Sequence, residues 1–80
     1  MNSFALKIIS SDGSVFETEC SSLVVPTDDG YYGIMSHHSP VIIAVAKGKI
    51  KYTIENNTEY IDTNGAILRF DNNEATILLR

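Results

Sequence analysis

The sequence predicts an all-β protein: an antiparallel β-sandwich, or flattened barrel, of about eight to ten short strands. Three observations lead to this fold class. Apolar residues alternate with polar ones over most of the chain, as in strands that bury one face and wet the other. Turn-forming residues separate these stretches at regular intervals. No stretch of ten residues combines a helical period with helix caps.

The expected strands follow in chain order. The alternating stretches should turn these residues to the core: Phe4, Leu6 and Ile8; Phe16, Thr18 and Cys20; Ile50, Tyr52 and Ile54; Ala66, Leu68 and Phe70. A short apolar strand is expected over 23–25, and a last one over 75–79. Residues 41–46 are apolar throughout, which predicts a strand covered on both faces. The turns between the strands are expected at 11–14, 47–48, 56–57, 63–65 and 71–74, where Gly and Asn accept positive φ.

Length and composition limit the function. The 80 residues predict a single domain over 1–80, and 44% of them are hydrophobic, which argues against disorder. The net charge is −4, and the lysines at 47, 49 and 51 are offset in sequence by Glu55, Glu59 and Asp62, so neither nucleic acid nor an anionic membrane is expected as a partner. Cys20 has no disulfide partner, and it follows Glu17 and Glu19 in a composition that suits a reducing compartment.

The stretch around His37 and His38 contains residue types found in metal sites and in hydrolytic triads. His37 and His38 could ligate a metal, but neighbours on an extended chain point to opposite sides, so one packed and one solvated histidine is expected. Ser36, Ser39 and Asp29 complete the residue types of a hydrolytic triad within the same loop, without a nucleophile elbow. The sequence therefore predicts no catalytic residue, no metal and no cofactor.

The remaining motifs also have a plain structural reading. Asn56-Asn57-Thr58 matches a glycosylation sequon but is expected to be a hairpin turn. Gly30 and Gly33 fit tight backbone turns, since no phosphate-binding motif is present. Tyr31 and Tyr32 should point to opposite sides of a strand. The exposed one is either a protein-contact anchor or a tyrosine packed on its own sandwich rim.

The order of the motifs resembles the N-terminal β-sandwich domain of the epsilon subunit of F-type ATP synthases, which is called delta in mitochondria. The resemblance covers nearly the whole chain and is strongest over 30–40, where the family has G-x-x-G-I, two residues, and Gly-His-Ala-Pro. Further matching segments are 6–10, 12–16, 23–26, the glycine hairpin 47–50, 64–70 (S-G-G-x-L-E-V in the family) and 73–78 (N-x-V-T-V-L).

Three departures from the family pattern are visible. His37 stands where the family usually has Gly, so the loop backbone is expected to turn differently. Tyr31 stands where many members carry an acidic residue that faces the membrane ring, so that contact would fall to Asp28 or Asp29. The resemblance ends at Arg80, without the C-terminal helical hairpin of most members. We therefore expect a form that supports assembly but does not brake ATP hydrolysis.

The resemblance implies a non-catalytic rotor component of a proton-translocating F-type ATP synthase, at the cytoplasmic face of a bacterial cell membrane. It would dock the gamma subunit to the polar loops of the c-ring, meet the membrane only through the complex, and couple proton flow to ATP synthesis. By matched position, the ring-facing residues would be Asp28, Asp29, Gly30, Tyr31, Tyr32 and His38, and the gamma-facing residues Ser10, His38 and Val41.

Two other classes of function remain open at this point. One is a stand-alone β-sandwich that binds a peptide or a sugar, which would show no affinity for a gamma subunit. The other is an enzyme, which would need a deep pocket that gathers His37 or His38 with a carboxylate.

Overall fold

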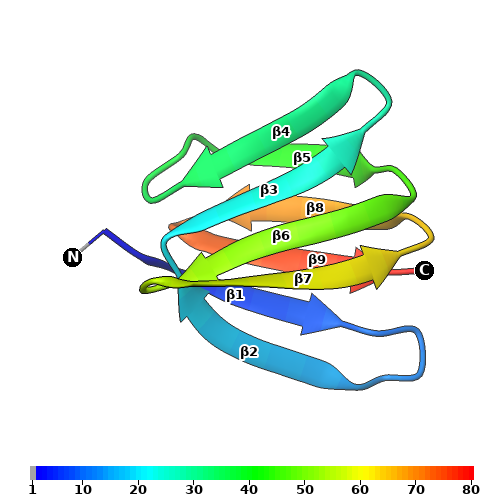
Figure 1. The fold of residues 1–80 in the computed structure, drawn as a ribbon, viewed down its shortest axis with the longest axis horizontal. Coiled ribbons are helices and arrows are strands. Elements are labelled where there is room, and N and C mark those ends of the chain that lie inside the picture. The colour runs from blue at the N-terminus through cyan, green and yellow to red at the C-terminus, as the bar shows by residue number, and fades with distance from the viewer. Residues whose placement is uncertain (1) are drawn as a thin grey trace.

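The computed structural model describes residues 2–80, which form nine strands and no helix in two stacked sheets (Figure 1). The all-β sandwich predicted from the sequence is thereby confirmed. The strands are β1 (Phe4–Ile9), β2 (Val15–Cys20), β3 (Ser22–Thr27), β4 (Gly30–Met35), β5 (Val41–Val45), β6 (Gly48–Ile54), β7 (Asn57–Thr63), β8 (Ala66–Asp71) and β9 (Glu74–Leu79). Within residues 2–80 there is no helix of a length and hydropathy that could cross a membrane.

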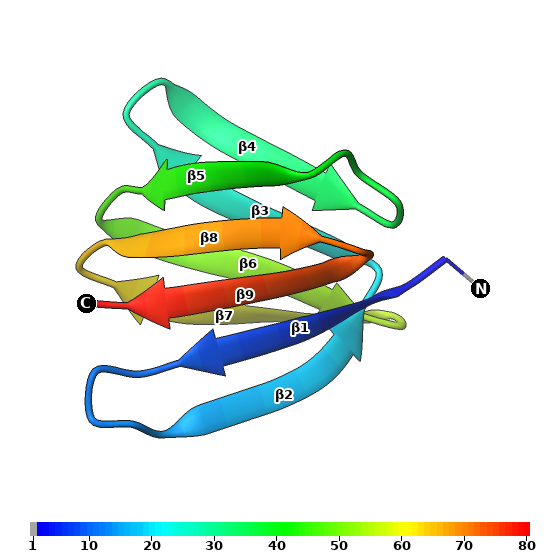
Figure 2. The same cartoon turned by 180° about the vertical axis from the view of Figure 1, so that it is seen from behind.

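One sheet has five strands in the order β2-β1-β9-β8-β5, and the other has four in the order β4-β3-β6-β7. Figure 2 shows the five-stranded sheet nearest the viewer. Among residues 2–80 all strand pairs are antiparallel except β1 and β9, which run parallel. The expectation of a wholly antiparallel sandwich is therefore corrected at this pair. The first and last strands meet inside one sheet, each already paired with its hairpin partner, so neither lies at an edge.

The core lies between the sheets and consists of the inward residues of the alternating strands. Phe4 and Phe70 meet edge to face within it, with ring centroids 5.4 Å apart. The residues predicted to face the core are buried in β1, β6 and β8, apart from a half-buried Ile54. Strand β2 departs from the prediction, because Phe16 is 43% exposed and packs against Tyr52 at a centroid distance of 6.0 Å. Because β2 is an edge strand with β1 as its only neighbour in the sheet, Phe16 faces inward at the margin of the core and stays partly open to solvent.

Strand β5 forms over the predicted apolar stretch, but the expectation that it is covered on both faces is wrong. Ile42 is 72% exposed and Ala44 is also exposed, while Val45 is buried. The reason is that the fold has two layers, so the outer face of β5, like that of the other strands, meets no further layer. Its outward apolar residues therefore form surface.

Two backbone hydrogen bonds join the layers at diagonal corners and make the sandwich a flattened barrel. The Ala46 amide donates to the Pro26 carbonyl at 2.8 Å, beside the ends of β5 and β3. The Ser21 amide donates to the Thr53 carbonyl at 2.8 Å, where the chain passes from β2 to β3. These bonds tie each sheet to the other at both sides and limit sliding between them.

Candidate interaction surface

A row of apolar residues crosses the whole outer face of the five-stranded sheet. The pairing registers place Val15 opposite Ile9, Ile9 opposite Leu78, Leu78 opposite Ile67, and Ile67 opposite Ala44. Because residues opposite one another share a face, these five side chains form one continuous line, the apolar row. Val15, Leu78 and Ile67 are 52%, 49% and 47% exposed. An exposed apolar line of this kind is typical of a protein-binding surface.

The next line of residues on the same face is mixed. It runs Glu17, Lys7, Thr76, Arg69 and Ile42, and its one apolar member, Ile42, is 72% exposed. Arg69 also lies 3.7 Å from Asp71 in an exposed ion pair. The apolar row is thus a distinct feature at the end of the sheet where β1 leads into Ser10, and charged residues border it on one side.

The predicted ring-facing residues Asp28, Asp29 and Gly30 form the exposed turn between β3 and β4. Thr27 fixes its shape, because its Oγ1 accepts a hydrogen bond from the Asp29 amide at 3.1 Å and donates to the Gly30 carbonyl at 2.6 Å. Gly30 has a φ of 115°, which a residue with a Cβ rarely adopts. Tyr31 follows directly and is 78% exposed, so the turn presents two carboxylates and an aromatic ring to solvent.

His38 and Tyr32 form a second, partly buried cluster. The His38 Nδ1 lies 2.7 Å from the Ser39 carbonyl, which can only accept, so Nδ1 carries the proton. Nε2 is then free to accept from the Tyr32 hydroxyl at 2.9 Å. The His38 ring also packs edge-on against Phe70 at 5.9 Å. His37 is exposed, so the structure has the packed and the solvated histidine that the sequence predicted.

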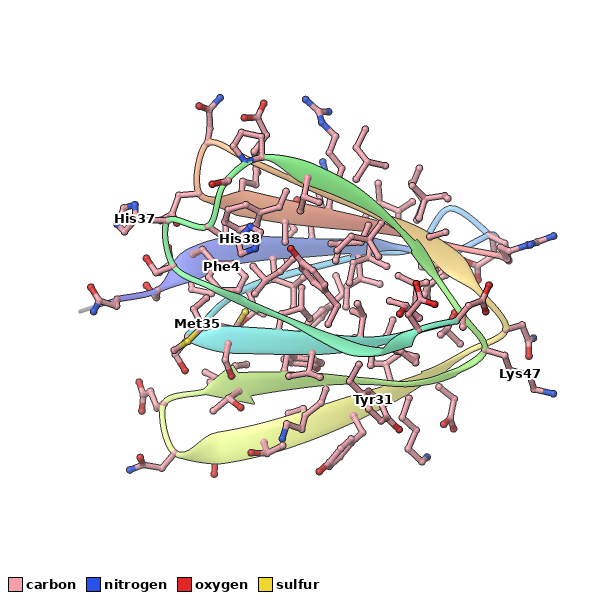
Figure 3. All side chains as sticks on the ribbon, turned by 90° about the horizontal axis from the view of Figure 1, so that it is seen from above. Phe4, Tyr31, Met35, His37, His38 and Lys47 are labelled. Carbon is pink, nitrogen blue, oxygen red and sulfur yellow. The ribbon has the colours of Figure 1, made fainter. Side chains whose placement is uncertain are left out.

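The structure divides the predicted site residues between the two ends of the molecule. Strand β4 separates the Asp28–Asp29 turn from the loop that carries His38, and its six residues span about 20 Å. Figure 3 shows His37, His38 and Met35 at one end and Lys47 at the other. Ser10 lies at the end with the Asp28–Asp29 turn, and Val41 begins β5 at the end with His38 (Figure 1). His38 is therefore not brought together with the acidic turn.

Sequence reasoning missed the residue that holds the histidine loop. Asn73, in the β8–β9 turn, accepts the His37 amide on its Oδ1 at 2.7 Å and donates from its Nδ2 to the Ser3 carbonyl at 3.0 Å. It thus ties the N-terminal segment, the β4–β5 loop and the β8–β9 turn together. His37 has a φ of 65°, the left-handed region, in the position that the family pattern gives to Gly. The sequence showed only that Asn suits a turn.

The described residues offer no support for catalysis or metal binding. Within 2–80, no three side chains of His, Cys, Asp or Glu come together as a metal site. Asp29 lies at the opposite end from both histidines, and the Nε2 of His38 is occupied by the Tyr32 hydroxyl. Burial raises the pKa of Cys20 to about 11, so its thiol stays protonated and unreactive at neutral pH.

Comparison with known proteins gives a consistent result. A family described as "ATP synthase, Delta/Epsilon chain, beta-sandwich domain" matches residues 3–80. The ATP synthase epsilon chain of Desulfitobacterium hafniense is 35% identical over 75 residues, covering 94% of this chain and 57% of the relative. That of Lactiplantibacillus plantarum is 37% identical over 79 residues, covering 95% and 56%. The chain thus spans somewhat over half the length of these curated relatives.

Solved structures share the fold at low sequence identity. A chain of the mitochondrial ATP synthase of Euglena gracilis, in an assembly of OSCP, F1 and c-ring, aligns with a TM-score of 0.83 at 13% identity, covering 92% of this chain and 48% of that one. A chain from the central stalk and c-ring of Tetrahymena thermophila mitochondrial ATP synthase aligns with a TM-score of 0.78 at 11% identity, covering 94% and 61%.

Proposed function

The chain belongs to the family of ATP synthase delta/epsilon β-sandwich domains, and from this premise we propose that it is a non-catalytic component of the central stalk of an F-type ATP synthase. In this role it docks the gamma subunit to the c-ring, forms one domain over residues 1–80, and helps to couple proton flow to ATP synthesis. Its place is the cytoplasmic face of a bacterial cell membrane, which it meets through the complex.

The apolar row is the observation that carries the proposal. It spans four strand spacings, about 19 Å, across the five-stranded sheet. We assign this face to the gamma subunit. Ser10 adjoins the row, because it follows Ile9 where β1 ends. Val41 and His38 lie at the other end of the sheet, where Val41 is paired with the core residue Phe70 and His38 packs against the Phe70 ring, so of the three residues that the sequence assigned to gamma only Ser10 lies beside the row.

We assign the turn of Asp28, Asp29, Gly30 and Tyr31 to the polar loops of the c-ring. The turn projects beyond the end of the sheets that also carries the apolar row. It offers exposed carboxylates for polar contacts and Tyr31 as an aromatic anchor. Tyr32 and His38 were also placed at this rim from the sequence. Their hydrogen bond joins them on the side of the β4–β5 loop, away from the acidic turn, so in the proposal they stabilise that loop instead of contacting the c-ring.

The role is mechanical, and the fold suits it. Torque can pass between two partners only if the linking body deforms little under load. The two sheets are joined at both sides by backbone hydrogen bonds, and aromatic pairs fill the core between them. Shear between the sheets would have to break these bonds and unpack the core together. A stiff double layer therefore transmits rotation without slip.

A pair of matched substitutions on β9 tests the gamma assignment. Leu78 belongs to the apolar row, and Thr76 lies two residues earlier on the same face. Leu78→Glu should weaken binding to a purified gamma subunit about 10-fold or more, since burial of the remaining leucine surface contributes on the order of 1.5 kcal/mol. Thr76→Glu adds the same charge and should change affinity less than about 3-fold. Equal losses for the two variants would contradict the assignment.

Charge reversal of Asp28 and Asp29 tests the ring-facing assignment. Both side chains are exposed, so the double lysine variant should keep its thermal stability and still bind gamma. In reconstituted vesicles it should lower proton-driven ATP synthesis more than it lowers ATP hydrolysis. Unchanged synthesis by the double variant would count against a contact between this turn and the c-ring.

A further inference from the structure

A groove crosses the outer face of the four-stranded sheet, on the side of the molecule away from the apolar row. It has a volume of about 390 Å³ and is lined by Val24, Tyr31, Lys49, Lys51 and Tyr60. The registers place Gly33, Val24, Lys51 and Tyr60 opposite one another in a single line over all four strands. Gly33 has no side chain and open space above it, and Val24 is short, so the floor of the groove is low near β4.

The walls of the groove stand on the two edge strands. Tyr31 on β4 is 78% exposed and Tyr60 on β7 is 59% exposed. The two strands are three strand spacings apart, about 14 Å. That width accommodates a polypeptide segment lying along the strands, with a tyrosine ring on either side, and it is too wide for both rings to grip one small molecule.

The charge of the groove is opposite to that of the chain. The net charge is −4, yet the charged residues that line the groove, Lys49 and Lys51, are both cations. Lys49 bonds Asp62 at 2.7 Å, in a pair whose side chains are 64% and 81% exposed. Lys51 has no ion pair within residues 2–80. It stands beside Tyr60 in the line across the sheet and is the cation left free to meet an anionic ligand.

Of the acidic residues near these lysines in the sequence, only some lie on the same face of the folded sheet and can pair with them. Glu59 is next to Tyr60 on β7 and therefore faces the opposite side of the sheet. It lies opposite Tyr52, whose pKa is raised by burial and then by the Glu59 charge. Asp62 alone among the acids of β7 shares the lysine face and bonds one of its lysines.

We propose that this groove binds an extended acidic segment of a partner protein, with carboxylates at alternate positions. In an extended segment, residues two apart point the same way and lie about 6.6 Å apart, which is also the spacing of Lys49 and Lys51 along β6. The carboxylates meet the two lysines, while the segment lies between the tyrosine rings and above Val24 and Gly33. Asp62 occupies one of these lysines in the free protein, so the ligand competes with it. The groove lies on the opposite side of the molecule from the apolar row and shares Tyr31 with the turn assigned to the c-ring, and the inference does not depend on the proposed function.

Fluorescence anisotropy with a labelled octapeptide of alternating Glu and Thr tests the inference. Two labelled octapeptides serve as controls. One alternates Lys and Thr, and the other has the composition of the acidic peptide but carries four Glu followed by four Thr. The wild-type chain should bind the alternating acidic peptide, bind the block peptide several-fold more weakly, and not bind the lysine peptide. Raising the salt concentration should weaken the binding, because the contacts are solvent-exposed ion pairs.

Three charge variants locate the site. Lys51→Glu should weaken binding about 10-fold, because it replaces an attraction by a repulsion. Asp62→Asn should tighten it roughly 2- to 5-fold by releasing Lys49, the range expected for one exposed ion pair. Lys7→Glu makes the same charge reversal on the opposite sheet and should change affinity less than about 2-fold. Tyr31→Ala removes one wall without a change of charge and should also weaken binding.

The inference is overturned if Lys7→Glu weakens binding as much as Lys51→Glu does, since the peptide would then respond only to net charge. It is likewise overturned if the block peptide binds as well as the alternating one, if Asp62→Asn has no effect, or if no binding exceeds that of the lysine peptide. Thermal melts of each variant show whether the fold is intact. If Lys51→Glu does not fold, the weaker binding expected of Tyr31→Ala and the tighter binding expected of Asp62→Asn test the inference instead.

Discussion

Removing the Asn73 side chain should destabilise the protein by about 2–3 kcal/mol, although the residue lies in a two-residue turn. Its amide makes two short hydrogen bonds, to the His37 amide at 2.7 Å and to the Ser3 carbonyl at 3.0 Å, each worth about 1 kcal/mol net, and its Oδ1 also accepts a longer bond from the Ser36 hydroxyl at 3.5 Å. Its φ is 58°, and an alanine in this left-handed region adds about 1 kcal/mol. For a domain of this size, Asn73→Ala should therefore lower the Tm by roughly 10–20 °C.

The neighbouring residue is a matched control. Asn72 occupies the same turn with a φ of 51°, is exposed, and has no side-chain hydrogen bond within residues 2–80. Asn72→Ala therefore carries the backbone strain alone, about 1 kcal/mol. The difference between the two variants isolates the hydrogen bonds of Asn73. Asn73→Asp keeps the acceptor for the His37 amide and loses the donor to Ser3, so it should fall between them.

Urea unfolding followed by circular dichroism measures these differences, and amide exchange shows where they act. Exchange of the His37 amide should speed up in Asn73→Ala beyond what the loss of global stability explains, because its acceptor is gone. Exchange of the Leu68 amide, in the core strand β8, should follow global unfolding only. If Asn72→Ala and Asn73→Ala lower the free energy of unfolding equally, the Asn73 side chain does not tie the N-terminal segment, the β4–β5 loop and the β8–β9 turn together.

Three further outcomes are expected. Leu68→Ala should cost about 2–5 kcal/mol in urea unfolding, because the side chain is fully buried; a loss below 1 kcal/mol would mean that the core collapses around the gap. Gly48→Ala should cost about 1–3 kcal/mol, because its φ is 155° and a Cβ would lie 3.1 Å from the Pro26 ring; a stability equal to wild type would contradict this. Burial raises the pKa of Cys20 from 9.0 to about 11, so the unfolded chain loses the thiol proton first and the free energy of unfolding falls as the pH rises through this window. That fall should be smaller in Cys20→Ala, and an unchanged pH profile would show that Cys20 does not contribute to it.

Much of the fold follows from local patterns. In β1, β6 and β8 the alternation alone identified the strand and its buried face, because a side chain in a strand has only two directions to take. The turn at 71–74 followed from Asn72 and Asn73, which both have positive φ. The turn predicted at 56–57 is shifted by one residue, because β7 begins at Asn57 and the positive φ falls on Glu55. The sequence misplaced Phe16 and the outer face of β5, because a local pattern does not show which strand lies at a sheet edge, as β2 does, or whether a third layer covers the sheet.

The sequence by itself determined most of the strands, though not β4 or β7, the inner faces of β1, β6 and β8, several turns and the family resemblance, since each depends on residues close together in the chain or on a linear order of motifs. The tertiary structure alone decided the parallel pairing of β1 with β9, the separation of His38 from the acidic turn, and both surfaces. The apolar row joins residues from five strands and the groove joins residues from four. Such lines exist only once distant strands pair, because a shift of one residue in any register would turn its member to the other face.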